Sequence, residues 1–111
     1  MKKSNKVQDI NSLYKAGAEA YAEGHAEKAL HYIDLVLKED PTHTMAWTLK
    51  GNCLDLLGKY EDALESYDTA IRLDPSDADI LFSKAETLEK MGREKDAKEI
   101  MDKAVKLDLG E

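Results

Sequence analysis

A pattern of 34 residues repeats three times through most of this 111-residue chain. The columns that align when the sequence is shifted by 34 are Gly24, Gly58 and Gly92; Ala29, Ala63 and Ala97; Asp40, Asp74 and Asp108; and Leu13, Trp47 and Leu81. The chain therefore divides into three units, residues 10–43, 44–77 and 78–111, after residues 1–9, a tail in which the first helix starts. Repeats of this length are typical of stacked helical units, because one unit cannot bury its apolar face alone.

Each unit is predicted to form two helices joined by a tight turn. In residues 58–77, GKYEDALESYDTAIRLDPSD, the apolar side chains recur at the three- and four-residue steps of one helical face. Before them, Trp47, Gly51 and Leu54 form the stripe of a first helix, and Gly58 can adopt the left-handed conformation that ends it. Neither helix is long enough to be stable by itself in water, so we expect packing between helices to stabilise both.

Composition and charge narrow the class of protein. The chain is 42% hydrophobic and 35% charged with two prolines, which favours a helical globular domain. It has no apolar run of transmembrane length and no signal-peptide pattern, so we expect no membrane partner. A single cysteine, Cys53, agrees with a reducing, cytoplasmic location. The net charge of −7 argues against nucleic-acid binding, which needs clustered Lys and Arg.

The middle unit carries the clearest family pattern. Its residues at the repeat positions are Trp47, Gly51, Leu54, Gly58, Tyr60, Ala63, Tyr67, Ala70 and Pro75. This series resembles the tetratricopeptide repeat (TPR), which has Trp, Leu-Gly, Tyr, Ala, Phe or Tyr, Ala and Pro in this order and spacing. The first unit departs from the pattern at Ala20 and Ala26, and the third at Glu94 and Leu109. The resemblance implies an all-α fold, a right-handed α-solenoid of three helix-turn-helix hairpins with six helices.

The resemblance also implies a concave groove, lined by the first helices, that holds a peptide or helix of a partner protein. Positions 2, 5, 9 and 12 of each unit share one side of the first helix, away from its core stripe. These positions hold Asn11, Tyr14, Ala18 and Tyr21; Met45, Thr48, Asn52 and Asp55; and Asp79, Phe82, Glu86 and Glu89. Aromatic side chains beside carboxylates favour a ligand with apolar side chains and Lys or Arg.

Each groove residue also has a simpler interpretation. The carboxylates can be ordinary solvated helix faces, Phe82 can pack against the preceding unit, and Tyr21 can cover the Gly24 turn. Asn52 is the most informative of the set, because an Asn at this position in TPR proteins commonly bonds the backbone of a bound peptide. The sequence leaves these alternatives open.

One function of the family is predicted to be absent. TPR domains that bind the acidic C-terminal tails of heat-shock chaperones use a clamp of Lys, Asn and Arg. The matching positions here are Tyr14, Ala18, Leu49, Asp79 and Ser83. None of them fits the clamp, and Asp79 would repel a ligand carboxylate. We therefore expect a partner other than these tails.

Catalytic and metal sites are also predicted to be absent. His25 and His31 are six residues apart, which does not give the i, i+4 spacing of a metal-binding pair, and His43 belongs to an inter-unit turn. Cys53 has no histidine nearby in the sequence to activate it, and we expect it to be half-buried. No glycine-rich phosphate loop is present. The chain is predicted to be a non-enzyme without cofactor or metal.

The last helix suggests a second class of function. Ile100, Met101 and Val105 lie where the next unit would pack, although interspersed charges make this helix partly self-capping. The leading hypothesis is an adaptor that binds a partner segment in the groove. The alternative is a structural module that forms a homodimer through this terminal helix, and a monomer with a small exposed patch is equally compatible.

The start of the chain extends the first helix. Val7 and Ile10 continue its apolar spacing toward Leu13, so we expect the helix to begin before residue 10, with Ser4 or Asn5 as its cap. Residues 1–3 are expected to be disordered.

Overall fold

The structure, a computed structural model, describes the backbone of residues 6–111 and the side chains of residues 9–111. Its helices are α1 (Lys6–Ala22), α2 (Ala26–Glu39), α3 (Thr44–Leu56), α4 (Tyr60–Leu73), α5 (Ala78–Lys90) and α6 (Glu94–Asp108). These six helices and no strand make up the regular structure of the described part, which confirms the predicted all-α fold. The first helix begins before residue 10 as predicted, while its proposed cap and the expected disorder lie outside the described residues. Within residues 6–111, no helix combines the length and hydrophobicity needed to cross a bilayer.

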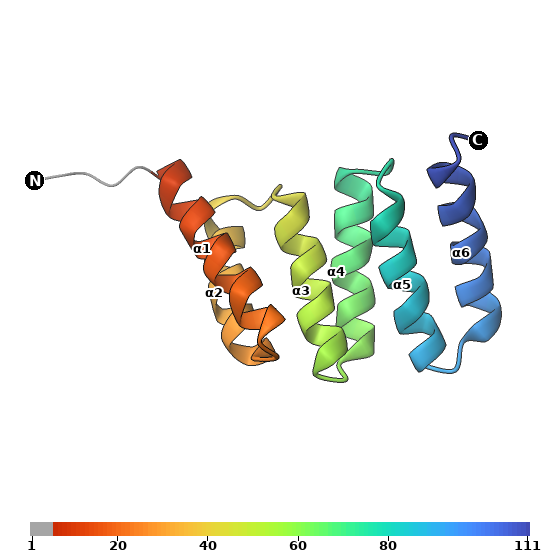
Figure 1. The fold of residues 1–111 in the computed structure, drawn as a ribbon, viewed down its shortest axis with the longest axis horizontal. Coiled ribbons are helices and arrows are strands. Elements are labelled where there is room, and N and C mark those ends of the chain that lie inside the picture. Colours follow the sequence, from red (N-terminus) through yellow and green to blue (C-terminus); the bar gives the residue numbers. More distant parts are fainter. Residues whose placement is uncertain (1–5) are drawn as a thin grey trace, which may run out of the picture.

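The helices form three hairpins that lie side by side in one row (Figure 1). Within the hairpins, α1 packs on α2, α3 on α4 and α5 on α6, and between them α2 packs on α3 and α4 on α5. The first helices also meet, α1 with α3 and α3 with α5, whereas in the described residues the second helices α2, α4 and α6 do not contact one another. The row is therefore closed more tightly along α1, α3 and α5, which places these helices on the inner side.

A left-handed glycine ends each first helix. At the end of α3, Gly58 has φ 78°, and the Lys59 N–H donates to the Leu54 carbonyl at 2.8 Å. This bond from the residue after the glycine back across the last turn is the Schellman arrangement, which satisfies a carbonyl that has no partner inside the helix. Gly24 and Gly92 have the same conformation, so the glycine column of the sequence corresponds to one repeated turn.

Side-chain caps begin the first helices of the second and third units. The His43 Nδ1 accepts from the Ala46 N–H at 3.1 Å, and the Asp77 carboxylate accepts from the Asp79 N–H at 2.9 Å. His43 and Asp77 are 34 residues apart, so the same position of the repeat supplies both caps. Sequence analysis placed His43 only in a turn, because histidine is not among the preferred capping residues.

The tightest packing of the core joins α3 to α4 at a glycine. A Cβ atom added to Gly51 would lie 2.5 Å from Cε1 of Tyr67, a distance that no ordinary contact allows. The Tyr67 ring thus occupies the space that the missing side chain leaves, and Tyr67 is only 2% exposed. Trp47 is half-buried, and its indole N–H donates to the Pro41 carbonyl at 2.8 Å.

Cys53 is fully buried, so the expectation of a half-buried side chain is wrong. It belongs to the core cluster that joins α2 to α3, together with Val36, Leu37 and Ala46. Sequence position alone did not show how completely α2 covers this side of α3.

The burial of Cys53 gives a test of this packing. Burial raises the pKa of the thiol from 9.0 to about 11. Because folding favours the neutral thiol, its contribution to stability is present below pH 9 and is lost as the pH rises toward 11. We expect Ellman's reagent at about pH 8 to leave the native thiol unmodified and to react fully after addition of denaturant. Rapid, stoichiometric labelling of the native protein would contradict the packing.

Candidate functional site

A cleft of about 340 Å³ lies on the inner side of the row, where the three first helices approach one another. We call it the inner cleft. Its lining residues are Tyr14, Thr44, Met45, Thr48, Leu49, Asn52, Asp74, Asp77, Asp79, Ile80 and Ser83. One side comes from α1, the base from α3 and the other side from α5 and the turn before it. The cleft therefore depends on all three units being stacked.

Asn52 lies at the base of the inner cleft with a fixed orientation. The Tyr67 hydroxyl donates to the Asn52 Oδ1 at 2.6 Å. Burial raises the pKa of Tyr67, so the phenol keeps the proton that it donates. The amide nitrogen of Asn52 has no hydrogen-bond partner within the described part of the chain. This nitrogen is a free donor, and its acceptor must come from a ligand or from water.

An aromatic pair forms one wall of the inner cleft. Tyr14 of α1 stacks on His43, with ring centroids 5.2 Å apart and an interplanar angle of 23°. Tyr14 is half-buried, and burial raises its pKa. Met45, on the first turn of α3, is 61% exposed and extends the apolar surface of this wall. The wall thus offers an aromatic ring and a flexible thioether to an apolar side chain of a ligand.

Carboxylates form the opposite wall. Asp74, Asp77 and Asp79 lie in the turn between α4 and α5 and on the first turn of α5. Asp74 accepts hydrogen bonds from Ser76, and Asp77 caps α5. Asp79 is exposed and takes part in no ion pair among the described residues. This end of the cleft is negative without a cation to neutralise it.

Four of the predicted groove residues come together in the inner cleft, namely Tyr14, Thr48, Asn52 and Asp79. The Thr48 hydroxyl donates to the Thr44 carbonyl, so it faces its own helix. Six others lie outside the cleft lining: Asn11, Tyr21, Asp55, Phe82, Glu86 and Glu89. Asn11, Glu86 and Glu89 are exposed, while Tyr21 and Phe82 are half-buried.

Asp55 is engaged inside the protein. Its carboxylate accepts hydrogen bonds from the Thr87 hydroxyl and, at 2.6 Å, from the Lys90 ammonium. The side chain of Asp55 is 13% exposed, and its bond with Lys90 raises the pKa of that lysine. Asp55 therefore joins α3 to α5 across the boundary between two units, and its carboxylate is already paired in this structure.

Sequence reasoning missed several residues of the inner cleft. They are His43, Thr44, Asp74, Asp77, Ile80 and Ser83, and the repeat position of Met45 alone was recognised beside them. Most lie in or next to the inter-unit turns, whereas the prediction used only the middle of each first helix. The column that holds His43 and Asp77 was the available signal, because it begins each of these helices.

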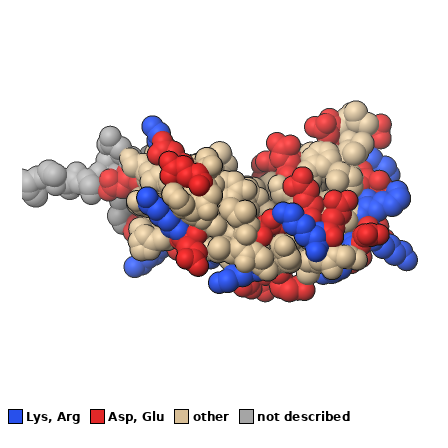
Figure 2. Space-filling model, turned by 60° about the horizontal axis from the view of Figure 1, so that its bottom comes forward, with Lys and Arg blue, Asp and Glu red and all other residues tan. Residues whose placement is uncertain are grey.

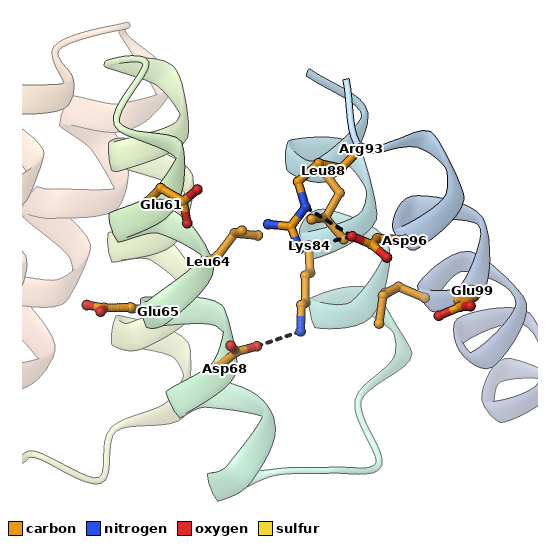
Figure 3. A pocket seen from close by; sticks show the side chains of 10 residues that line it. Glu61, Leu64, Glu65, Asp68, Lys84, Leu88, Arg93, Asp96 and Glu99 are labelled. Atoms are coloured by element: carbon orange, nitrogen blue, oxygen red, sulfur yellow. Dashed lines mark hydrogen bonds and ion pairs between the residues drawn. The ribbon is translucent and has the colours of Figure 1, made fainter. Parts of the chain in front are cut away.

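A second cleft, of about 410 Å³, lies between α4, α5 and α6, away from the inner side (Figure 3). Leu64, Leu88 and Ile100 form its apolar floor. Its two cations are paired, Lys84 with Asp68 at 2.7 Å and Arg93 with Asp96 at 3.0 Å. We call it the outer cleft. Because its charged groups hold neighbouring helices together, its arrangement is that of an inter-unit seam.

The residues predicted for self-association do not form one surface. Ile100 lies in the outer cleft and faces α4, and Met101 is half-buried. Val105 is 43% exposed on α6. Charged side chains surround it, and in Figure 2 the blue Lys and Arg side chains gather at the end of the molecule where α6 lies.

Family profiles match three overlapping or adjacent stretches of the chain. The profile described as "TPR repeat" matches residues 51–92, and two described as "Tetratricopeptide repeat" match residues 32–65 and 78–110. The matches span most of the sequence, and they coincide with helices that recur every 34 residues. The chain is a tetratricopeptide repeat protein. A comparison of this TPR protein with curated sequences finds no match.

Solved structures share the fold of this TPR protein. MamA AMB-1 is 24% identical with a TM-score of 0.85, over 92% of this chain and 60% of the MamA chain. SycD, a type III secretion translocator chaperone of Yersinia enterocolitica, is 23% identical with a TM-score of 0.87, over 93% of this chain and 80% of SycD. A CopN–Scc3 complex contains a chain 20% identical with a TM-score of 0.76, over 90% of this chain and 56% of that one. The TPR protein thus spans less than two thirds of MamA, and identities this low establish the fold alone.

Proposed function

We propose that this TPR protein is a non-catalytic interaction module, a scaffold or adaptor that binds a segment of a partner protein in the inner cleft. The observation that carries the proposal is the free amide nitrogen of Asn52. Tyr67 fixes the orientation of this amide by bonding to its oxygen. A donor held in place at the base of a cleft suits a backbone carbonyl of an extended peptide or of a helix end.

The two walls of the inner cleft define the chemistry of the ligand. Tyr14 and Met45 favour an apolar side chain on one side of the bound segment. Asp77 and Asp79 favour Lys or Arg on the other side, and they would repel an acidic tail. SycD is a chaperone of a translocator, and the CopN–Scc3 structure is a complex of two proteins. A shared fold with such proteins supports a protein partner for this chain as well.

Substitution of Asn52 by Asp tests the proposal without disturbing the core. The aspartate keeps an oxygen that can accept from Tyr67, but it removes the N–H donor that faces the cleft. We expect peptides selected from a phage-displayed random library to carry Lys or Arg beside apolar residues. Their affinity should fall about ten- to a hundredfold with Asn52→Asp, the effect of losing one hydrogen bond in a desolvated site. Isothermal titration calorimetry measures the change.

Asn11→Asp is the matched control, because Asn11 is exposed on α1 and lies outside the cleft lining. It adds the same charge, so equal losses for both variants would mean that net charge, and not the inner cleft, governs binding. Selection of acidic peptides, or affinity unchanged by Asn52→Asp, would contradict the proposal.

A further inference from the structure

One ion pair recurs at both boundaries between units. The Lys50 ammonium of α3 binds the Asp34 carboxylate of α2 at 3.0 Å, and Lys84 of α5 binds Asp68 of α4 at 2.7 Å (Figure 3). The two pairs are 34 residues apart, so they are the same contact made twice. The lysine side chains are only 28% and 21% exposed, because their stems are packed between the helices that they join. Each second helix thus presents an aspartate to the lysine of the next first helix.

The aspartate of the third unit lacks this partner. Asp102 of α6 occupies the column of Asp34 and Asp68, and it pairs with Lys98 of its own helix at 3.5 Å. Lys98 and Asp102 are 77% and 61% exposed, so this contact is solvated and loose. A cation that precedes its carboxylate by four residues also has the less favourable orientation along a helix. Asp102 is therefore available to a second, better-placed cation.

Apolar residues around Asp102 are incompletely covered. In the column of Leu37, Ile71 and Val105, the first residue is 8% exposed, the second half-buried and the third 43% exposed. Leu37 belongs to a cluster that includes α3, and Ile71 packs on the cluster that contains Ile80 of α5. Met101 follows the same trend, because its equivalents Ile33 and Tyr67 are buried whereas Met101 is half-buried. We call Lys98, Met101, Asp102 and Val105 the outer face of α6.

We propose that the outer face of α6 binds a helix of a partner protein that carries a cation between two large apolar residues. The pattern comes from the helices that fill the equivalent places. They contribute Trp47-x-x-Lys50-Gly51-x-x-Leu54 and Leu81-x-x-Lys84-Ala85-x-x-Leu88. The partner helix is accordingly of the form large apolar, two residues, Lys or Arg, Gly or Ala, two residues, large apolar. Its cation binds Asp102, and its small residue permits close approach to Met101 and Val105.

The occupant is a different protein and not a second copy of this chain. The remaining first helix, α1, has Leu13, Ala16, Gly17 and Ala20 at the four positions, so it offers no cation to Asp102. The helices that do carry the lysine, α3 and α5, are already packed on both sides within the chain. A head-to-tail stack of copies would leave Asp102 facing an alanine. The inference concerns a surface separate from the inner cleft and does not depend on the proposed function of that cleft.

Lys98 tunes this surface. It stands in the column of Leu30 and Leu64, where Leu64 is packed against Leu88 of the following hairpin. An incoming helix must move the Lys98 ammonium aside while keeping its stem in contact. A leucine at position 98 restores the side chain of the other two columns and removes the competing cation.

The test uses a fluorescein-labelled, hydrocarbon-stapled peptide with the sequence of residues 78–90, ADILFSKAETLEK, titrated with the full chain. Fluorescence anisotropy reports binding. We expect saturable binding that weakens about tenfold with Asp102→Asn, and by a similar factor when the peptide lysine is replaced by alanine. Lys98→Leu should strengthen binding about tenfold, and Glu99→Gln, a matched change in the outer cleft, should leave it unchanged.

Three results would overturn the proposal. The first is no saturable binding of the peptide to the wild-type chain or to Lys98→Leu. The second is binding that Asp102→Asn leaves intact. The third is binding lost with Asn52→Asp, which would move the peptide to the inner cleft. A wild-type chain that sediments as a dimer dissociated by Asp102→Asn would instead identify a second copy as the occupant, and would also overturn it.

Discussion

We expect Tyr67→Ala to lower the free energy of unfolding by about 3–5 kcal/mol, the usual cost of truncating a buried aromatic residue. Tyr67 is 2% exposed, lies in the cluster with Leu54, Ala63 and Ile80, and bonds to Asn52 through its hydroxyl. Its removal leaves a cavity that the surrounding helices cannot fill without moving. Urea unfolding followed by circular dichroism measures the loss.

Tyr67→Phe separates the ring from the hydroxyl. It keeps the packing and removes one hydrogen bond, so the expected loss is only about 1 kcal/mol. A loss as large as that of Tyr67→Ala would mean that the bond to Asn52, and not the ring, stabilises the pair.

A double-mutant cycle with Gly51 identifies the contact itself. In the wild type, Gly51→Ala forces a methyl group against the Tyr67 ring and should cost about 1–3 kcal/mol. In Tyr67→Ala the space is empty, and the higher helix propensity of alanine should make the same change stabilising by about 0.5–1 kcal/mol. The sign of the Gly51 effect therefore reverses. Additive effects of the two substitutions would contradict the packing of α3 on α4.

The repeat columns predicted the helices well because each column encodes a local event. Gly58 ends a helix by its own conformational freedom, and Gly51 marks a close approach wherever its partner lies. Both properties belong to one residue and need no knowledge of distant neighbours. For this reason the sequence placed α3 and α4 within a residue or two of their observed bounds.

The candidate site was harder to predict because its residues are defined by contacts between units. Asp55 has the right position for the groove, but Thr87 and Lys90, more than thirty residues later in the chain, bond its carboxylate. His43 contributes to the inner cleft through its stack on Tyr14, which no local pattern indicates. Helical-wheel position therefore identified the correct side of each first helix, while availability to a ligand depended on the neighbouring unit.

Stacking is predicted to be the source of stability for every hairpin. In the middle unit, α3 is covered by Val36 and Leu37 of α2, and α4 is covered by Ile80 of α5. An isolated hairpin loses both covers and keeps only the contact between its own two helices. Helices of 13 and 14 residues are marginal in water without such packing.

The most direct measurement is the far-ultraviolet circular dichroism of a peptide of residues 44–77, the middle unit, beside that of the whole chain. We expect the isolated unit to show less than about a third of the helix content that it has in the chain, and to melt without a cooperative transition. A fragment of residues 44–111, in which Ile80 again covers α4, should recover most of the helix in α4. An isolated middle unit that is as helical as in the whole chain and melts cooperatively would contradict stacking as the source of stability.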